Sequence, residues 1–132
     1  QQAQAVCEKL VDVVELMEQF SWCSSAQRIW VHTPCTLGPG QGLDDRVGAL
    51  LAKAGAEVIT GKQDLACCGS AGTYSVLQPL LANELRGRMQ QTWADSKPEF
   101  IVTSNVGCQL HLAVDSQVPV VHWLEYLRQH QV

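Results

Sequence analysis

The sequence has few basic residues and no long apolar run, and both absences restrict the functions open to it. Only 9 of its 132 residues are Lys or Arg, against 13 Asp or Glu, so the formal net charge is −4. Proteins that bind nucleic acid carry a basic patch, and no nucleic-acid partner is expected here. The apolar runs are only a few residues long, whereas a membrane-spanning helix needs about 20. No basic amphipathic segment suggests insertion into a membrane surface.

The chain also lacks the features of a secreted protein. Its first residues, Gln1 to Gln4, show neither an initiator methionine nor the charged-then-apolar pattern of a signal peptide. We therefore expect a fragment of a longer protein. Six cysteines are many for such a chain, but a domain of this size can bury a core without disulfide bonds. The adjacent Cys67 and Cys68 would rarely bridge each other. We expect a reducing compartment and thiols kept for metal or redox chemistry.

The hydrophobic pattern predicts a single α/β domain over residues 1–132. Apolar residues make up 46% of the sequence and charged residues 17%, which excludes a disordered chain. After an expected N-terminal helix at 3–20, a core over 28–130 alternates β-rich runs with helical patterns. The expected strands are 28–33, 56–60, 100–104 and 118–121. The helices expected after them are 43–54, 73–95, 108–114 and 123–129, and the intervening loops include 21–27, 36–42 and 61–72.

This alternation predicts a four-stranded, mainly parallel sheet with helices on both faces, in the doubly wound manner. By analogy with other doubly wound sheets, we expect the strand order 2-1-3-4. Gly55 is expected to end the helix at 43–54, because glycine readily adopts the left-handed conformation of a helix C-cap.

Four cysteines follow the ends of three different expected strands. Cys35 follows the first strand, Cys67 and Cys68 lie in the loop after the second, and Cys108 lies in the turn after the third. The carboxyl ends of parallel strands meet at one edge of a sheet, where such folds bind ligands. Thiolates are soft ligands that suit iron–sulfur clusters and zinc. The sequence therefore predicts that these four thiols converge on a metal or redox site.

The histidines are secondary candidates for the same site. His111 lies about one helical turn after Cys108, so both side chains could face one ligand. A lone histidine near a loop more often has a structural role, and we treat His32 and His122 in this way. Three residues are expected to have packing or surface roles only: Cys7, Cys23 and His130.

The segments around these cysteines resemble the cysteine-rich CCG domain family. The resemblance lies in residues 32–35 (HTPC), 67–69 (CCG) and 105–108 (NVGC), with 31 residues between the first two cysteines and 39 between Cys68 and Cys108. Residues 67–74 and 103–112 are most similar to the C-terminal CCG domain of glycolate oxidase iron–sulfur subunits. Other members of the family serve heterodisulfide reductases and complexes that oxidise lactate or glycerol 3-phosphate.

The resemblance implies an electron-transfer module that is not catalytic on its own. It implies a [4Fe–4S] cluster whose ligands are Cys35, Cys67, Cys68 and Cys108. The implied partners are the flavin-containing subunits of a glycolate oxidase, the rest of the iron–sulfur subunit and, indirectly, a quinone-type acceptor in the membrane. The implied location is cytoplasmic, at the inner face of the cell membrane through the complex.

One departure from the family pattern leaves alternatives for the metal. The family motif ends in Cys-x-x-Cys, whereas this chain has His111 in the last position. The site could hold a [4Fe–4S] cluster through four cysteines, hold zinc, or be metal-free in a domain that only docks the flavin subunit. The parent complex could also be one that oxidises lactate or glycerol 3-phosphate. A thiol-dependent enzyme using Cys67 and Cys68 is disfavoured, because no general base is evident beside them.

Overall fold

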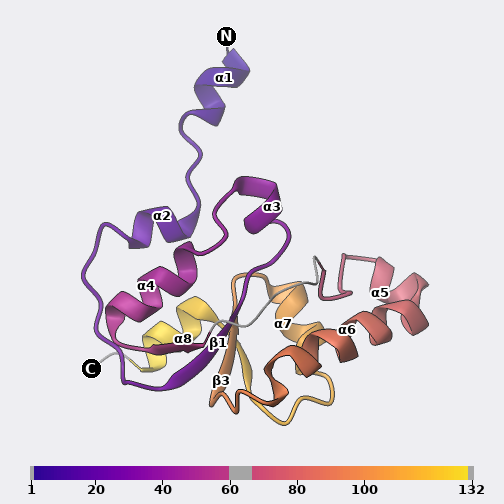
Figure 1. Cartoon of the computed structure of the whole chain (residues 1–132). Helices are drawn as coiled ribbons and strands as arrows, with labels where there is room; N and C mark the ends of the chain where they lie inside the picture. Colours follow the sequence, from indigo (N-terminus) through magenta and orange to yellow (C-terminus); the bar gives the residue numbers. More distant parts are fainter. Residues whose placement is uncertain (1, 60–66, 131–132) are drawn as a thin grey trace.

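The computed structural model describes residues 2–59 and 67–130, and its core is one parallel sheet (Figure 1). The strands are β1 (Arg28–His32), β2 (Glu57–Ile59), β3 (Phe100–Thr103) and β4 (Val120–His122). They lie in the order β2-β1-β3-β4, and all three pairings are parallel. The expected α/β class and strand order are thus confirmed. The end of the expected second strand, Thr60, and loop residues 61–66 lie outside the described residues.

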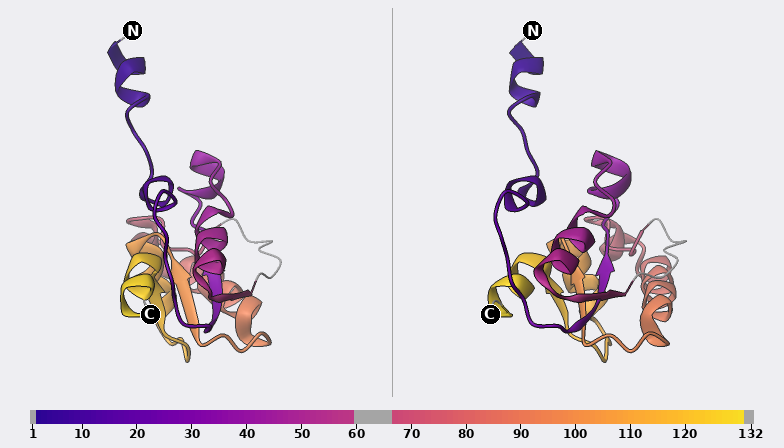
Figure 2. Two further views of the ribbon diagram at one scale, coloured as in Figure 1. Left: turned by 90° about the vertical axis from the view of Figure 1, so that its left-hand side faces the viewer. Right: turned by 60° about the vertical axis from the view of Figure 1, so that its left-hand side comes forward.

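Helices cover both faces of this sheet. In chain order they are α1 (Gln2–Cys7), α2 (Val13–Met17), α3 (Gly38–Gln41), α4 (Arg46–Ala54), α5 (Tyr74–Leu77), α6 (Pro79–Ala94), α7 (Val106–Ala113) and α8 (Trp123–Gln129). Figures 1 and 2 show α4 and α8 on one side of the sheet and α6 and α7 on the other. Within the described parts of the chain, no helix is both long and apolar enough to cross a membrane.

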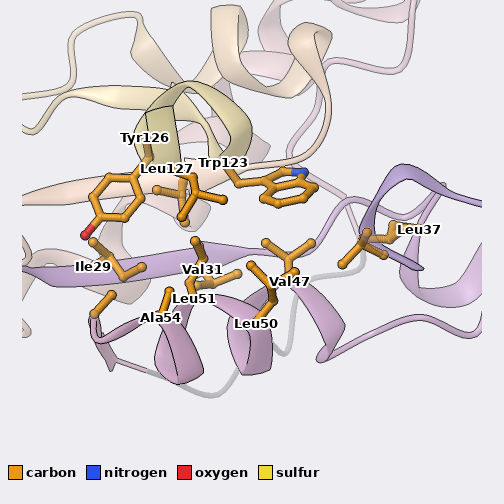
Figure 3. Packing of buried hydrophobic residues seen from close by; sticks show 13 residues of the cluster. Ile29, Val31, Leu37, Val47, Leu50, Leu51, Ala54, Trp123, Tyr126 and Leu127 are labelled. Carbon is orange, nitrogen blue, oxygen red and sulfur yellow. The ribbon is translucent and has the colours of Figure 1, made fainter. Parts of the chain in front are cut away.

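Side-chain alternation along β1 builds a separate apolar layer on each face. Ile29 and Val31 pack against the buried side chains of α4 and α8 (Figure 3). Trp30, between them in sequence, points to the opposite face, where it packs with Met89 and Trp93 of α6. Cys68 and Cys108 belong to this second layer. These two metal-site candidates are therefore anchored to the α6–α7 side of the sheet.

The expected helix over 3–20 is wrong as a continuous element, because the structure has α1 and α2 with a break between them. Asp12 starts α2 as its N-cap, and its carboxylate accepts a hydrogen bond from the Val14 N–H at 3.0 Å. In return, the Asp12 N–H donates to the Glu15 carboxylate at 2.9 Å. This reciprocal capping box fixes a new helix start. Of these two helices, α2 has one buried residue, Val14, whereas α1 is exposed and projects from the rest of the domain (Figure 1).

A similar break divides the expected helix over 73–95. Gln78 adopts φ −129° and ψ 56° and separates α5 from α6, because the ring of Pro79 disfavours a helical conformation in the preceding residue. The expected loop over 36–42 contains the short helix α3, which ends at Gly42 with φ 71°. Two other predictions are confirmed: α8 spans the expected residues, and Gly55 ends α4 with φ 117°.

Candidate metal centre

A cavity of about 470 Å³ lies at the carboxyl edge of the sheet, and all four predicted cysteines line it. Cys35 reaches it from the loop after β1, Cys67 and Cys68 from the segment that precedes α5, and Cys108 from the first turn of α7. The strand order explains this convergence, because β1 and β3 are neighbours and their carboxyl ends open on the same side. Four thiols from three separate segments therefore share one cavity.

Cys68 and Cys108 form the buried part of this thiol set. Cys68 is 3% exposed and Cys108 is 7% exposed, and their Sγ atoms lie 3.1 Å apart. When one of the two protons is lost, the Cys108 Sγ–H donates to the Cys68 thiolate. This hydrogen bond lowers the pKa of Cys68 to about 7 and raises the pKa of Cys108. The contact thus favours the loss of one proton from the pair, and the thiolate that this leaves is the form that binds metal.

His32 completes a compact buried group with these two thiols. It is the last residue of β1 and is 3% exposed, and a nitrogen of its ring lies within 4.8 Å of both sulfur atoms. Its Nδ1 lies 2.9 Å from the hydroxyl oxygen of Thr103, the residue paired with it on β3. Burial lowers the pKa of His32 to about 4, so the ring is neutral at neutral pH. A neutral imidazole can serve as a metal ligand or as a hydrogen-bond donor.

The other two cysteines lie nearer to solvent. Cys67 is half-buried, and its Sγ accepts a hydrogen bond from the Gly69 N–H at 3.3 Å. Burial raises the pKa of the Cys67 thiol. Cys35 is exposed. The cavity therefore has a buried side with two thiols and an imidazole, and an outer side with two further thiols.

Two glycines allow the segments that carry the cysteines to approach one another. Gly69 has φ 93°, and a Cβ at this position would lie 2.6 Å from the backbone oxygen of Ala82 on α6. A Cβ at Gly107 would lie 3.1 Å from both the Asn105 Oδ1 and the Ser70 Oγ. Asn105 also caps α7, because its Oδ1 accepts a hydrogen bond from the Cys108 N–H at 3.1 Å. Close packing therefore requires glycine at position 69, whereas at position 107 a larger residue would press on two side chains that can shift by a few tenths of an ångström.

Among the described residues, His111 does not belong to the cavity lining, although its Nε2 would lie 3.1 Å from a Cβ at Gly69. Its Nε2 donates to the backbone oxygen of Ala82 at 3.2 Å, so the ring bridges α7 and α6. Helical spacing from Cys108 favours His111, whereas the histidine that the structure groups with the Cys68 and Cys108 sulfur atoms is His32, for which a structural role was expected. His32 ends a central strand and pairs with Thr103 on the next strand, and this position is the sequence signal that could have favoured His32 as a site residue.

The remaining histidine candidate and the residues expected to have only packing or surface roles are not among the described residues that line the cavity. The Nδ1 of His122 accepts a hydrogen bond from the Leu124 N–H and caps α8. Cys7 and Cys23 are both exposed, in α1 and in the segment before β1. His130 follows α8, where its Nδ1 donates to a backbone oxygen of that helix.

Comparison with known proteins assigns the chain to a family. The model of the CCG family, described as a cysteine-rich domain, matches residues 29–113, which include all four cysteines of the cavity. The chain belongs to the CCG cysteine-rich domain family. This finding confirms the resemblance that the sequence showed.

Two relatives of this CCG domain have names that bear on function. The glycolate oxidase iron–sulfur subunit of Escherichia coli (strain K12) is 38% identical over 131 residues, which cover 96% of this chain and 32% of that protein. Lactate utilization protein A of Oceanobacillus iheyensis is 26% identical over 132 residues, which cover 96% of this chain and 53% of that protein. The chain thus spans between about a third and a half of the length of these relatives.

The donor atoms of the CCG domain fit a soft metal centre. Two thiolates on one tetrahedral ion, with metal–sulfur bonds of about 2.3 Å, stand about 3.8 Å apart. The 3.1 Å between Cys68 and Cys108 Sγ needs only a small opening to reach that spacing, which is the spacing of a single ion. In a four-iron cluster each thiolate binds a different iron, so these two sulfur atoms would have to separate further. A four-iron cluster needs thiolates distributed around it, and Cys35 and Cys67 supply two more on the outer side of the cavity. In number and chemistry, the cysteines fit an iron–sulfur cluster.

Proposed function

We propose that this CCG domain is an electron-transfer module that holds a [4Fe–4S] cluster. Its proposed ligands are Cys35, Cys67, Cys68 and Cys108. The observation that carries the proposal is the meeting of four thiols from three segments at one cavity. A bound cluster supplies one-electron redox chemistry. The role of the chain is to ligate it and to limit access of water on its buried side, where Cys68 and Cys108 lie in an apolar layer.

The ionisation of these thiols supports ligation at physiological pH. The Cys108 contact lowers the pKa of Cys68, which favours a thiolate within the buried pair. Binding of a metal then displaces the proton that Cys108 keeps in the metal-free pair, since the ligand form is the thiolate. Cys35, on the exposed side, is accessible to incoming iron.

The proposed setting is a complex that oxidises glycolate. The higher identity to a glycolate oxidase iron–sulfur subunit than to a lactate utilization protein favours glycolate over lactate as the substrate of the complex. In this setting, a flavin-containing subunit oxidises the hydroxy acid. The CCG domain accepts electrons from that side, together with the rest of the iron–sulfur subunit. It passes them towards a quinone-type acceptor at the cytoplasmic face of the membrane.

Cysteine variants purified without air test the ligand assignment. We expect Cys→Ser at each of the four cavity positions to lower the iron and acid-labile sulfide content and the reversible bleaching of the visible absorbance by dithionite. The exposed Cys7→Ser and Cys23→Ser are matched controls and should retain both. Equal losses in all six variants would show that the loss of iron reflects general instability rather than ligation.

A second candidate function is a zinc-bound docking domain, and the compact His32–Cys68–Cys108 group favours it. One ligand atom from each of these residues lies within 4.8 Å of the other two, which suits a single tetrahedral ion. This candidate predicts one zinc and no sulfide per chain. It also predicts that Cys35→Ser retains the metal while Cys108→Ser loses it. The same elemental analysis therefore separates the two functions.

A further inference from the structure

His32 lies beside the two buried thiols and forms a buried polar pair with Thr103, and neither residue is one of the proposed ligands. His32 is 3% exposed and Thr103 is 0% exposed. Buried polar side chains are expected to form hydrogen bonds, and the 2.9 Å contact between His32 Nδ1 and Thr103 Oγ1 accounts for one nitrogen of the ring. The strand pairing fixes this contact, because His32 and Thr103 are directly paired between β1 and β3.

The second ring nitrogen is the one left for the sulfur atoms. A nitrogen of His32 and the Sγ atoms of Cys68 and Cys108 lie within 4.8 Å of one another. A neutral imidazole carries one N–H and one lone pair, whereas a threonine hydroxyl can donate as well as accept. If the Thr103 hydroxyl donates to Nδ1, the ring proton must be on Nε2, from which it can be donated to a thiolate.

We propose that His32, oriented by Thr103, donates a hydrogen bond from Nε2 to a thiolate of the Cys68–Cys108 pair and thereby raises the reduction potential of the centre. This inference rests on the proposed cluster. Hydrogen bonds to the sulfur atoms of an iron–sulfur centre stabilise its reduced, more negative state. Thr103 acts through His32 and is a positioning residue. His111 does not take this role, because its Nε2 is bonded to the backbone oxygen of Ala82.

Redox titration of four variants tests the proposal on the loaded protein. His32→Phe keeps the ring volume and removes the N–H, so we expect unchanged iron and sulfide and a shift of the midpoint potential to more negative values. Thr103→Val, close to threonine in shape, should shift the potential in the same direction by less. Thr103→Ser retains the hydroxyl and should have the same midpoint potential as the wild type. His111→Phe is the matched control and should leave the potential unchanged.

Three results would overturn the inference. An unchanged potential in His32→Phe would show that no hydrogen bond reaches the sulfur atoms. Loss of iron in the same variant, with the fold retained by circular dichroism, would make His32 a ligand. A shift in His111→Phe equal to that in His32→Phe would show that the potential responds to any loss of histidine. A wild-type protein without iron and sulfide would instead refute the proposed function.

A measurement on the metal-free protein is independent of the cluster. The ¹⁵N chemical shifts of a histidine ring show which nitrogen carries the proton. We expect His32 to be the neutral Nε2–H tautomer at pH 7, and Thr103→Val to raise the population of the other tautomer. A predominant Nδ1–H tautomer in the wild type would overturn the inference, because Thr103 would then be the acceptor and Nε2 would have no proton to donate.

Discussion

Replacement of Gly69 by alanine should destabilise the domain more than any other single methyl addition near the site. With φ 93°, an alanine at this position pays about 1–2 kcal/mol for the left-handed backbone. Its Cβ would also lie 2.6 Å from the Ala82 backbone oxygen and 3.1 Å from the Leu85 Cβ, so helix α6 or the cysteine segment must move. Overpacking of this kind typically costs about 1–3 kcal/mol. The expected loss in the free energy of unfolding is therefore roughly 2–5 kcal/mol.

Gly72→Ala provides the matched control for this prediction. Gly72 also has a positive φ, of 60°, but no atom of the described residues lies within 4 Å of a Cβ at this position. Only the backbone cost of about 1–2 kcal/mol should remain. Urea unfolding of the metal-free proteins at pH 7 measures both values, provided that the m-values agree. Equal losses in the two variants would refute the steric interpretation of the close approach between Gly69 and α6.

Three further predictions concern stability. Gly87→Ala in α6 should raise the free energy of unfolding by about 1 kcal/mol in urea titrations, because alanine favours the helix and its Cβ meets no described atom within 4 Å. Leu51→Ala, at a 0% exposed site, should cost about 2–5 kcal/mol, whereas Leu80→Ala, at an 85% exposed site, should change stability by less than about 0.5 kcal/mol. In the metal-free protein, the pKa of His32 is depressed to about 4 from an ordinary 6.5. The free energy of unfolding should therefore keep its full His32 contribution above pH 6.5 and fall by about 3 kcal/mol as the pH drops to 4. The His32→Phe variant should lack this pH-dependent loss.

The sequence was sufficient to predict the sheet and the position of the cysteines. The β-rich runs end where the strands end to within one or two residues, and right-handed crossovers leave few topologies for such an alternation. Once the strand order was set, the cysteines after three strands had to meet at one edge. The predicted bounds of the last helix agree with those of α8, Trp123–Gln129, because a strand and the capping His122 fix where the helix starts.

Features set by competition between local signals were harder to predict. Apolar residues recur at helical spacing through 3–20, but the capping box of Asp12 and Glu15 starts a new helix inside that pattern. The helix expected over 73–95 is likewise interrupted near its start, where Pro79 follows the break between α5 and α6. Whether His32 or His111 faces the thiols depends on contacts between residues far apart in sequence, which one-dimensional spacing does not specify.

The iron and acid-labile sulfide content of the anaerobically purified domain, reconstituted with both elements, tests the central proposal most directly. We predict four iron and four sulfide per chain, bound to the cavity that Cys35, Cys67, Cys68 and Cys108 line. One zinc per chain with no sulfide, retained after exposure to excess iron and sulfide, would contradict the proposed cluster and identify the compact His32, Cys68 and Cys108 group as a single-ion site.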